Sequence, residues 1–262
     1  APGVPMERGA VYIFQENAPL NWEFSSKIQP IDLSYGDHFG YRVDVFGDTL
    51  LATAPSVQYG NDQWKGAVYL FRKDGAQWAQ IAKLTPDDPL ANGTFGSDVS
   101  LGDGRLLLSA TGPTGTRGAA YVFEETNTGQ WKQTAKLAPD GFPEGVRIGY
   151  VSLSGDLASV IASPTSSGSQ DRVAYVFEHD GLGNWLQTDA LKSDRALNSF
   201  GFALTSTAEQ VIVSSGVNSS GAVHVFSRVP EPNALPLACG LTVSLLGRSR
   251  GKLWLAARQL RV

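Results

Sequence analysis

The chain has 262 residues, enough for one large β domain or two ordinary ones, and only 18% of them are charged. A low charge combined with 29 glycines favours many short strands joined by turns over a helical bundle. Five basic residues and no acid lie in 248–262, whereas the rest of the chain carries 16 basic and 25 acidic side chains. Such an acidic body argues against nucleic-acid binding, which needs a basic face.

One short apolar segment recurs five times along the chain, which indicates a repeat architecture. It reads GAVYIF at 9–14, GAVYLF at 66–71, GAAYVF at 118–123, RVAYVF at 172–177 and GAVHVF at 221–226. Alternate residues of a strand point to opposite faces, so both faces of each segment are apolar. We therefore expect every VYxF segment to form a strand that is covered on both sides.

The elements that follow each VYxF segment keep the same order along the chain. A Trp comes seven or eight residues after the final Phe of the first four segments and begins a more polar strand, at Trp22, Trp78, Trp131 and Trp185. Next come an aromatic-or-aliphatic residue plus Gly, a half-buried strand, a turn and an aliphatic strand. Four short strands per unit of roughly 50 residues predict the blades of a β-propeller. A β-sandwich, the rival fold, would not need one segment copied five times in register.

These residues resemble the FG-GAP repeat, the blade unit of the integrin α-chain propeller and of many bacterial surface proteins. Phe39-Gly40 and Phe95-Gly96 carry the first half of the motif, and Ala54-Pro55 resembles its ending. The resemblance covers about residues 9–226, and it implies an all-β propeller of four-stranded blades over residues 1–228. The third unit departs from the motif with Ile148, and the fourth lacks the Gly-Asp turn.

Four full units and one extra leading VYxF strand leave the closure of the ring open. Residues 22–28 could supply the missing Trp strand of the fourth unit, beside 221–226, and close a ring of four blades. The leading segment 9–14 would then be surplus, and the chain opens without the signal peptide expected of an exported protein. We therefore expect an incomplete ring, in which 9–28 is the outer half of an unfinished blade and upstream blades are missing.

The segment 229–262 differs in character from the repeats. An apolar run over 234–247 and a basic end follow the motif Val229, Pro230, Glu231, Pro232. This order resembles the PEP-CTERM sorting signal, although LWLAARQLRV continues beyond the usual stop. The resemblance implies a short apolar helix over 234–247 that inserts transiently into a membrane, processing by an exosortase, and a final location at the cell surface, in the outer envelope or outside the cell. The run is shorter than the roughly 20 residues that span a bilayer comfortably, and the basic flank fits a cytoplasmic end. We expect this segment to pack little against the propeller.

No catalytic, cofactor or metal site is predicted. His38, His179 and His224 lie outside any catalytic motif, and the closest approach to a calcium loop, 88–93, lacks its middle ligand. The Trp and Tyr residues that recur in every unit are interpreted as packing residues. Trp64 has no counterpart in the other units and lies in the long loop 56–65, so it is a candidate binding residue.

The sequence thus predicts a non-enzymatic interaction module that binds protein or exopolysaccharide at the cell surface. The alternative is a hydrolase or lyase built on a propeller scaffold. That alternative would need convergent acid, base or nucleophilic side chains, and none stands out.

Overall fold

The computed structural model describes most of the chain, in segments separated by short gaps. The described residues are 8–59, 63–75, 77–88, 93–102, 104–112, 117–140, 145–164, 172–193, 200–217, 220–229, 245–249 and 252–257. The chain divides into two compact units, which are Ala1–Pro113 with Tyr121–Thr134, and Thr114–Ala120 with Ala135–Val262. Each unit is described by itself below.

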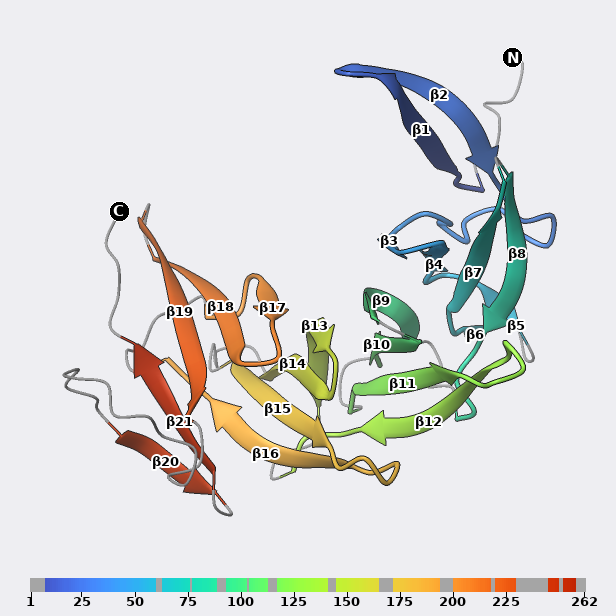
Figure 1. Cartoon of the computed structure of the whole chain (residues 1–262). Coiled ribbons are helices and arrows are strands. Elements are labelled where there is room, and N and C mark those ends of the chain that lie inside the picture. The colour runs from blue at the N-terminus through green and yellow to red at the C-terminus, as the bar shows by residue number, and fades with distance from the viewer. Residues whose placement is uncertain are drawn as a thin grey trace. The chain divides into compact units, whose positions relative to one another are not determined.

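The elements of the described residues are β-strands throughout (Figure 1). The first half of the chain forms β1 (Val11–Ala18), β2 (Asn21–Ile28), β3 (Val43–Phe46), β4 (Thr49–Ala54), β5 (Gln58–Tyr59), β6 (Gln63–Trp64), β7 (Ala67–Asp74), β8 (Gln77–Leu84), β9 (Thr94–Gly102), β10 (Arg105–Thr111), β11 (Ala119–Glu125) and β12 (Trp131–Leu137). The second half forms β13 (Val146–Ser154), β14 (Leu157–Pro164), β15 (Val173–His179), β16 (Trp185–Leu191), β17 (Leu204–Ser206), β18 (Gln210–Val217), β19 (Ser220–Val229), β20 (Leu245–Ser249) and β21 (Lys252–Ala257).

The repeats form antiparallel sheets with one strand order. The four-stranded sheets are β3-β4-β7-β8, β9-β10-β11-β12 and β13-β14-β15-β16, so each runs from the FG strand through the aliphatic and VYxF strands to the Trp strand. The VYxF segment is always the third strand, and each Trp lies at the start of the next strand out. The predicted phase of the repeat is therefore confirmed, and the fold is all-β with four-stranded blades of the propeller type.

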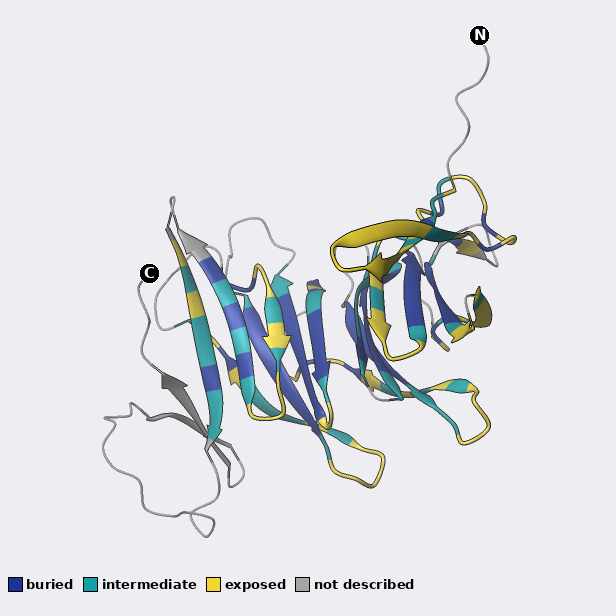
Figure 2. Cartoon of the chain, turned by 45° about the horizontal axis from the view of Figure 1, so that its top comes forward, coloured by how far each residue is buried: buried dark blue, intermediate teal, exposed yellow. Residues whose placement is uncertain are grey.

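The third strand of a complete sheet is buried on both faces, as its sequence predicts. Tyr69 and Tyr121 are both 0% exposed. Figure 2 shows the middle strands of the sheets as the buried part of each unit. The Phe of the FG pair packs edge-on against this strand, because Phe95 lies 5.6 Å from Tyr121 and 6.0 Å from Phe123 between ring centroids. Such edge-to-face pairs add to the free energy gained by burying the rings.

A glycine in front of the VYxF strand allows each FG pair of the first unit to dock closely on the preceding repeat. The Phe95 N–H donates to the Lys65 carbonyl oxygen at 3.1 Å, and the Phe39 N–H donates to the Arg8 carbonyl oxygen at 3.2 Å. At Gly66, a Cβ atom would lie 2.3 Å from the Phe95 carbonyl oxygen. The glycine is therefore required by close approach of two backbones as well as by its φ of +78°.

The leading repeat consists of a two-stranded sheet, β1 paired with β2. This agrees with the expectation that 9–28 forms the outer half of a blade. In the last sheet, residues 225–229 of β19 pair with β21, so another strand occupies the edge at which 22–28 could have been added. Within the part of the chain that the structure describes, β2 has β1 as its strand partner.

The tail departs from its expected structure where it is described. Residues 234–244 lie outside the described residues, but Leu245–Ser249 is strand β20, so the end of the expected helix is wrong. Strand β21 pairs with β19 and extends the last sheet to β17-β18-β19-β21-β20. The expectation that the tail packs little is therefore also wrong at this edge. The physical reason is that an outer strand with open N–H and C=O groups gains hydrogen bonds from any strand that can pair with it.

The membrane segment expected in the tail was a helix. Among the described residues, no helix has both the length and the apolar character needed to cross a bilayer.

Candidate functional site

Trp64 and Val229, two of the residues singled out in the sequence, belong to different compact units of the chain. Trp64 is on β6, which pairs with β5 through Gln58, and the N–H groups of Lys65 and Gly66 donate to the Val57 carbonyl oxygen at 3.0 and 3.1 Å. The expected loop 56–65 is thus partly a short hairpin beside the FG joint. Of the sorting motif, Val229 ends β19 opposite Leu253, whereas Pro230, Glu231 and Pro232 lie outside the described residues.

Two of the histidines occupy packing or turn positions. His224 takes the place of the repeated Tyr, with its ring 5.4 Å from that of Phe200 and its Nε2 2.8 Å from the Ser215 Oγ. His38 has a φ of +56°, and its Nδ1 lies 3.0 Å from the Ser56 Oγ. The third, His179, has its Nδ1 3.5 Å from an Asp156 carboxylate oxygen, and the same nitrogen accepts a hydrogen bond from the Gly181 N–H at 3.3 Å.

The acidic residues of the turns are engaged with local partners. Asp37 accepts a hydrogen bond from the Ser34 N–H at 2.6 Å, and Asp44 accepts one from the Leu101 N–H at 2.8 Å. No group of three or more His, Cys, Asp or Glu side chains that could hold a metal ion occurs within the described segments.

One cluster of titratable side chains joins the connection before β3 to the first complete sheet. The Lys83 Nζ lies 2.5 Å from an Asp32 carboxylate oxygen, and the Tyr69 hydroxyl donates to the same oxygen at 3.3 Å. Burial raises the pKa of Tyr69, and this outweighs the lowering effect of Lys83. Burial lowers the pKa of Lys83, but the hydrogen bonds with Asp32 and Tyr69 raise it by more than burial lowers it. The pKa of Lys83 therefore lies above its usual range. Both Tyr69 and Lys83 stay protonated at neutral pH, so neither of these two side chains is an activated nucleophile or a general base.

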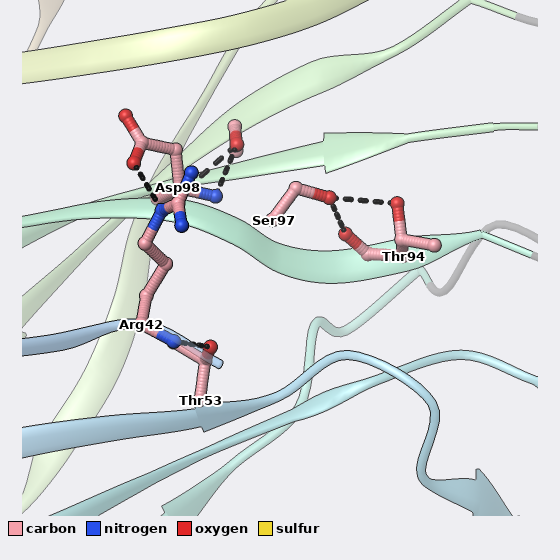
Figure 3. A network of polar contacts seen from close by, with 6 residues as sticks. Arg42, Thr53, Thr94, Ser97 and Asp98 are labelled. Atoms are coloured by element: carbon pink, nitrogen blue, oxygen red, sulfur yellow. Dashed lines mark hydrogen bonds and ion pairs between the residues drawn. The ribbon is translucent and has the colours of Figure 1, made fainter. Parts of the chain in front are cut away.

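A second polar network joins the FG strands of neighbouring repeats in the first unit (Figure 3). The Arg42 Nε donates to an Asp98 carboxylate oxygen at 3.1 Å, and the Arg42 N–H donates to the Thr53 Oγ1 at 3.1 Å. The second unit contains a related contact, in which the Ser206 N–H donates to the Ser152 Oγ at 2.9 Å. The contacts of Arg42 with Asp98 and of Ser206 with Ser152 hold one repeat against the next, so the side chains that form them have a structural role.

The largest cluster of exposed aromatic side chains on one element lies on the β1–β2 hairpin (Figure 2). We call it the aromatic hairpin face, and it consists of Tyr12 (56% exposed), Phe14 (55%), Trp22 (63%) and Phe24 (59%). Ring centroids lie 6.4 Å apart for Tyr12 and Phe24, and 6.1 Å apart for Phe14 and Phe24. Tyr12 and Trp22 were interpreted as packing residues, because Tyr and Trp recur at one phase of the repeats.

Phe24 distinguishes this hairpin from the other outer strands. The residue two positions after the Trp is Gln80, Gln133 or Gln187 in the complete repeats. Gln133 accepts a hydrogen bond from the Asp87 N–H at 3.1 Å, and Gln187 accepts one from the Asp140 N–H at 2.8 Å. A Phe cannot accept such a bond, so this position in the first repeat suits apolar contact. Comparing the four Trp segments position by position would have revealed this difference in the sequence.

The comparison with protein families identifies the class of repeat. Residues 22–71 and 78–123 match the family model of the FG-GAP repeat. The chain is therefore an all-β protein of the propeller type that carries FG-GAP repeats.

Solved structures resemble the chain at low sequence identity. A protein from Lactobacillus plantarum is 16% identical, with a TM-score of 0.46, and the match covers 76% of this chain and 56% of that protein. The periplasmic gluconolactonase of Pseudomonas aeruginosa is 15% identical, with a TM-score of 0.36, and the match covers 80% of this chain and 73% of that enzyme. This chain thus spans little more than half the length of the Lactobacillus protein. No curated protein matches the sequence.

The expectation that the chain is not an enzyme requires correction. The solved structures that resemble it include a gluconolactonase, which is a hydrolase. The fold by itself gives no ground for excluding catalysis.

Proposed function

We propose that the chain is an exported repeat module that binds a protein or polysaccharide ligand at the cell surface through the aromatic hairpin face. The observation that carries the proposal is the exposure of four aromatic rings on one hairpin, when the equivalent Tyr69 and Phe71 are 0% and 3% exposed. Tyr and Trp are enriched at binding surfaces because each offers a large apolar ring together with a polar group. A contiguous exposed apolar patch commonly marks a binding site.

The face also has polar groups at its margin that suit a hydrated ligand. The Lys27 Nζ lies 5.8 Å from the centre of the Tyr12 ring, and Glu16 is opposite Trp22 in the hairpin register. A cation within about 6 Å of the centre of an aromatic ring is attracted to the ring face. A surface that combines flat rings with one positive and one negative side chain fits sugar rings and protein side chains alike.

The export part of the proposal rests on the tail. Val229, Pro230, Glu231 and Pro232, the apolar run 234–247 and the basic end follow one another in the order of a PEP-CTERM signal. In this proposal an exosortase processes the chain after transient membrane insertion, and the module then acts at the cell surface or outside the cell.

The binding surface is tested by removing two of its rings. We expect the double substitution Trp22→Ser with Phe24→Ser to weaken binding to the cell envelope by roughly tenfold or more, because central aromatic residues dominate the free energy of such interfaces. The measurement is binding of the full chain to purified envelope polysaccharide and, separately, to envelope proteins. If affinity is lost for the polysaccharide, the ligand is a polysaccharide. If affinity is lost for the envelope proteins, the ligand is a protein.

A matched control removes apolar side chains elsewhere. Leu182 and Leu186, on the β15–β16 connection and strand, are 87% and 53% exposed. The variant Leu182→Ser with Leu186→Ser should bind as the natural sequence does. Unchanged binding by the Trp22 and Phe24 variant would contradict the proposed surface.

The sorting role is tested by deleting 230–262. We expect the truncated protein, expressed in a bacterium with an exosortase, to move from the cell-bound fraction into the medium while its three complete four-stranded sheets stay folded. The double substitution Pro230→Ala with Pro232→Ala alters the motif alone and should block processing. Retention of the truncated protein in the cell-bound fraction, or normal processing of the Pro230 and Pro232 variant, would contradict the sorting role.

A further inference from the structure

The last repeat is the one repeat that lacks its Trp strand in the sequence pattern, and the structure places another strand there. Strand β21 pairs antiparallel with β19, the VYxF strand of that repeat, at the position that β8 and β16 hold in their sheets. The edge of β19 is therefore occupied by a segment from the C-terminal tail.

The register of this pairing is that of the genuine Trp strands. In complete repeats the Trp is opposite the residue two positions after the final Phe of VYxF, as Trp78 is opposite Lys73 and Trp185 opposite His179. The hairpin β1–β2 has the same register, with Trp22 opposite Glu16. In the last repeat, Trp254 is opposite Arg228, which is again two positions after Phe226.

The sequence around Trp254 has the spacing of a Trp strand. A Leu follows Trp185 by six residues in WLQTDAL at 185–191, and a Leu follows Trp254 by six residues in WLAARQL at 254–260. Residues 258–260 lie outside the described residues, so this second observation comes from the sequence and is independent of the pairing. It also accounts for the stretch that continues beyond the usual stop of a sorting signal.

We infer that β21 is the outer strand of the last repeat, separated from its VYxF strand by an insertion that contains the sorting-like segment. Trp254 follows Phe226 by 28 residues, whereas the other Trp residues follow their Phe by seven or eight. Pairing satisfies the N–H and C=O groups on the outer edge of β19, which would otherwise be open to other chains.

The inference has a consequence for the tail that rests on the proposed function. While β21 is paired with β19, both ends of the apolar run 234–247 are tied to the same sheet. The run cannot then cross a membrane with its basic end on the far side. Strand β21 therefore holds the tail on the sheet, and it must separate from β19 before the apolar run can insert into a membrane.

The pairing is tested by disulfide trapping in the full chain. In a Cys239→Ser background, Ser227→Cys with Leu255→Cys joins two positions that are directly opposite. The control, Ser227→Cys with Leu253→Cys, uses the same residue types two positions out of register. The Cβ atoms of opposite residues in an antiparallel pair lie about 5 Å apart, and those of diagonal residues about 7–8 Å apart. The diagonal distance is too long for an unstrained disulfide.

We expect the pair in register to cross-link roughly tenfold faster than the control under mild oxidation, as measured by mass spectrometry of the linked peptides. Equal rates, or no cross-link in protein whose circular dichroism is unchanged, would overturn the inference. This readout needs neither exosortase nor membrane, so a failure of the sorting proposal leaves it intact. Hydrogen exchange gives a second measurement, since amides of 253–257 should exchange slowly in the full chain if β21 is paired.

Discussion

Replacing Gly66 with Ala should lower the free energy of unfolding by about 3–4 kcal/mol, because the added methyl group would clash with the backbone of the neighbouring repeat. The new Cβ would lie 2.3 Å from the Phe95 carbonyl oxygen and 2.8 Å from its nitrogen. The φ of +78° adds a cost of about 1 kcal/mol for any residue with a Cβ. The hydrogen bond from the Phe95 N–H to Lys65 must lengthen if the strands move apart, so the joint between two repeats is weakened. Thermal unfolding should show the melting temperature falling by roughly 10 °C.

Gly75 provides a control for the backbone cost alone. It has a φ of +60°, and a Cβ placed on it would meet nothing within 4 Å. Gly75→Ala should therefore cost only about 1 kcal/mol. If the two variants had equal melting temperatures, the close approach at Gly66 would not be important for stability.

Truncation of Phe95 to Ala should cost about 3–5 kcal/mol, the range for removing a fully buried Phe. The side chain is 1% exposed and packs edge-on against Tyr121 and Phe123. Its removal leaves a cavity between the FG strand and the VYxF strand of the second repeat. Chemical denaturation should report the loss as a lower midpoint with an unchanged slope.

Two further variants test whether the loss of stability depends on burial of the side chain or on the residue being Phe. Phe46 is 51% exposed on β3, so Phe46→Ala should change the free energy of unfolding by less than about 1 kcal/mol. The third repeat carries Ile148 at the FG position, where it is 0% exposed. Phe95→Ile should therefore be milder than Phe95→Ala. An equal loss for Phe46→Ala and Phe95→Ala would contradict the assignment of Phe95 to the core.

The strand order of the repeats could be predicted because the same residues recur at fixed offsets. Tyr69 and Tyr121 occupy equivalent strands, and the Trp strand follows each one as the spacing indicates. Burial on both faces followed from the two apolar sides of VYxF. A single short apolar run can be either a strand or part of a buried helix, and several copies in the same sequence context resolve this ambiguity.

Other features could not be predicted in this way, because they depend on a single copy. Trp64 has no counterpart in the sequences of the other repeats, so no second copy supported the β5–β6 hairpin that contains it. The pairing of β21 with β19 links residues far apart in sequence through a register that composition does not reveal. Tyr12 and Trp22 of the aromatic hairpin face were interpreted as packing residues, since Tyr and Trp recur at the same phase of the other repeats. Exposure there depends on which neighbours are present, and a repeat pattern alone does not specify them.

The joint between repeats has an evolutionary consequence. The bonds from Phe39 to Arg8 and from Phe95 to Lys65 join backbone to backbone, with a glycine as the main requirement on sequence. A duplicated repeat therefore brings both halves of a working joint with it, the glycine at one end and the FG pair at the other. Gene duplication could lengthen or shorten such an array one unit at a time, without first evolving a new interface.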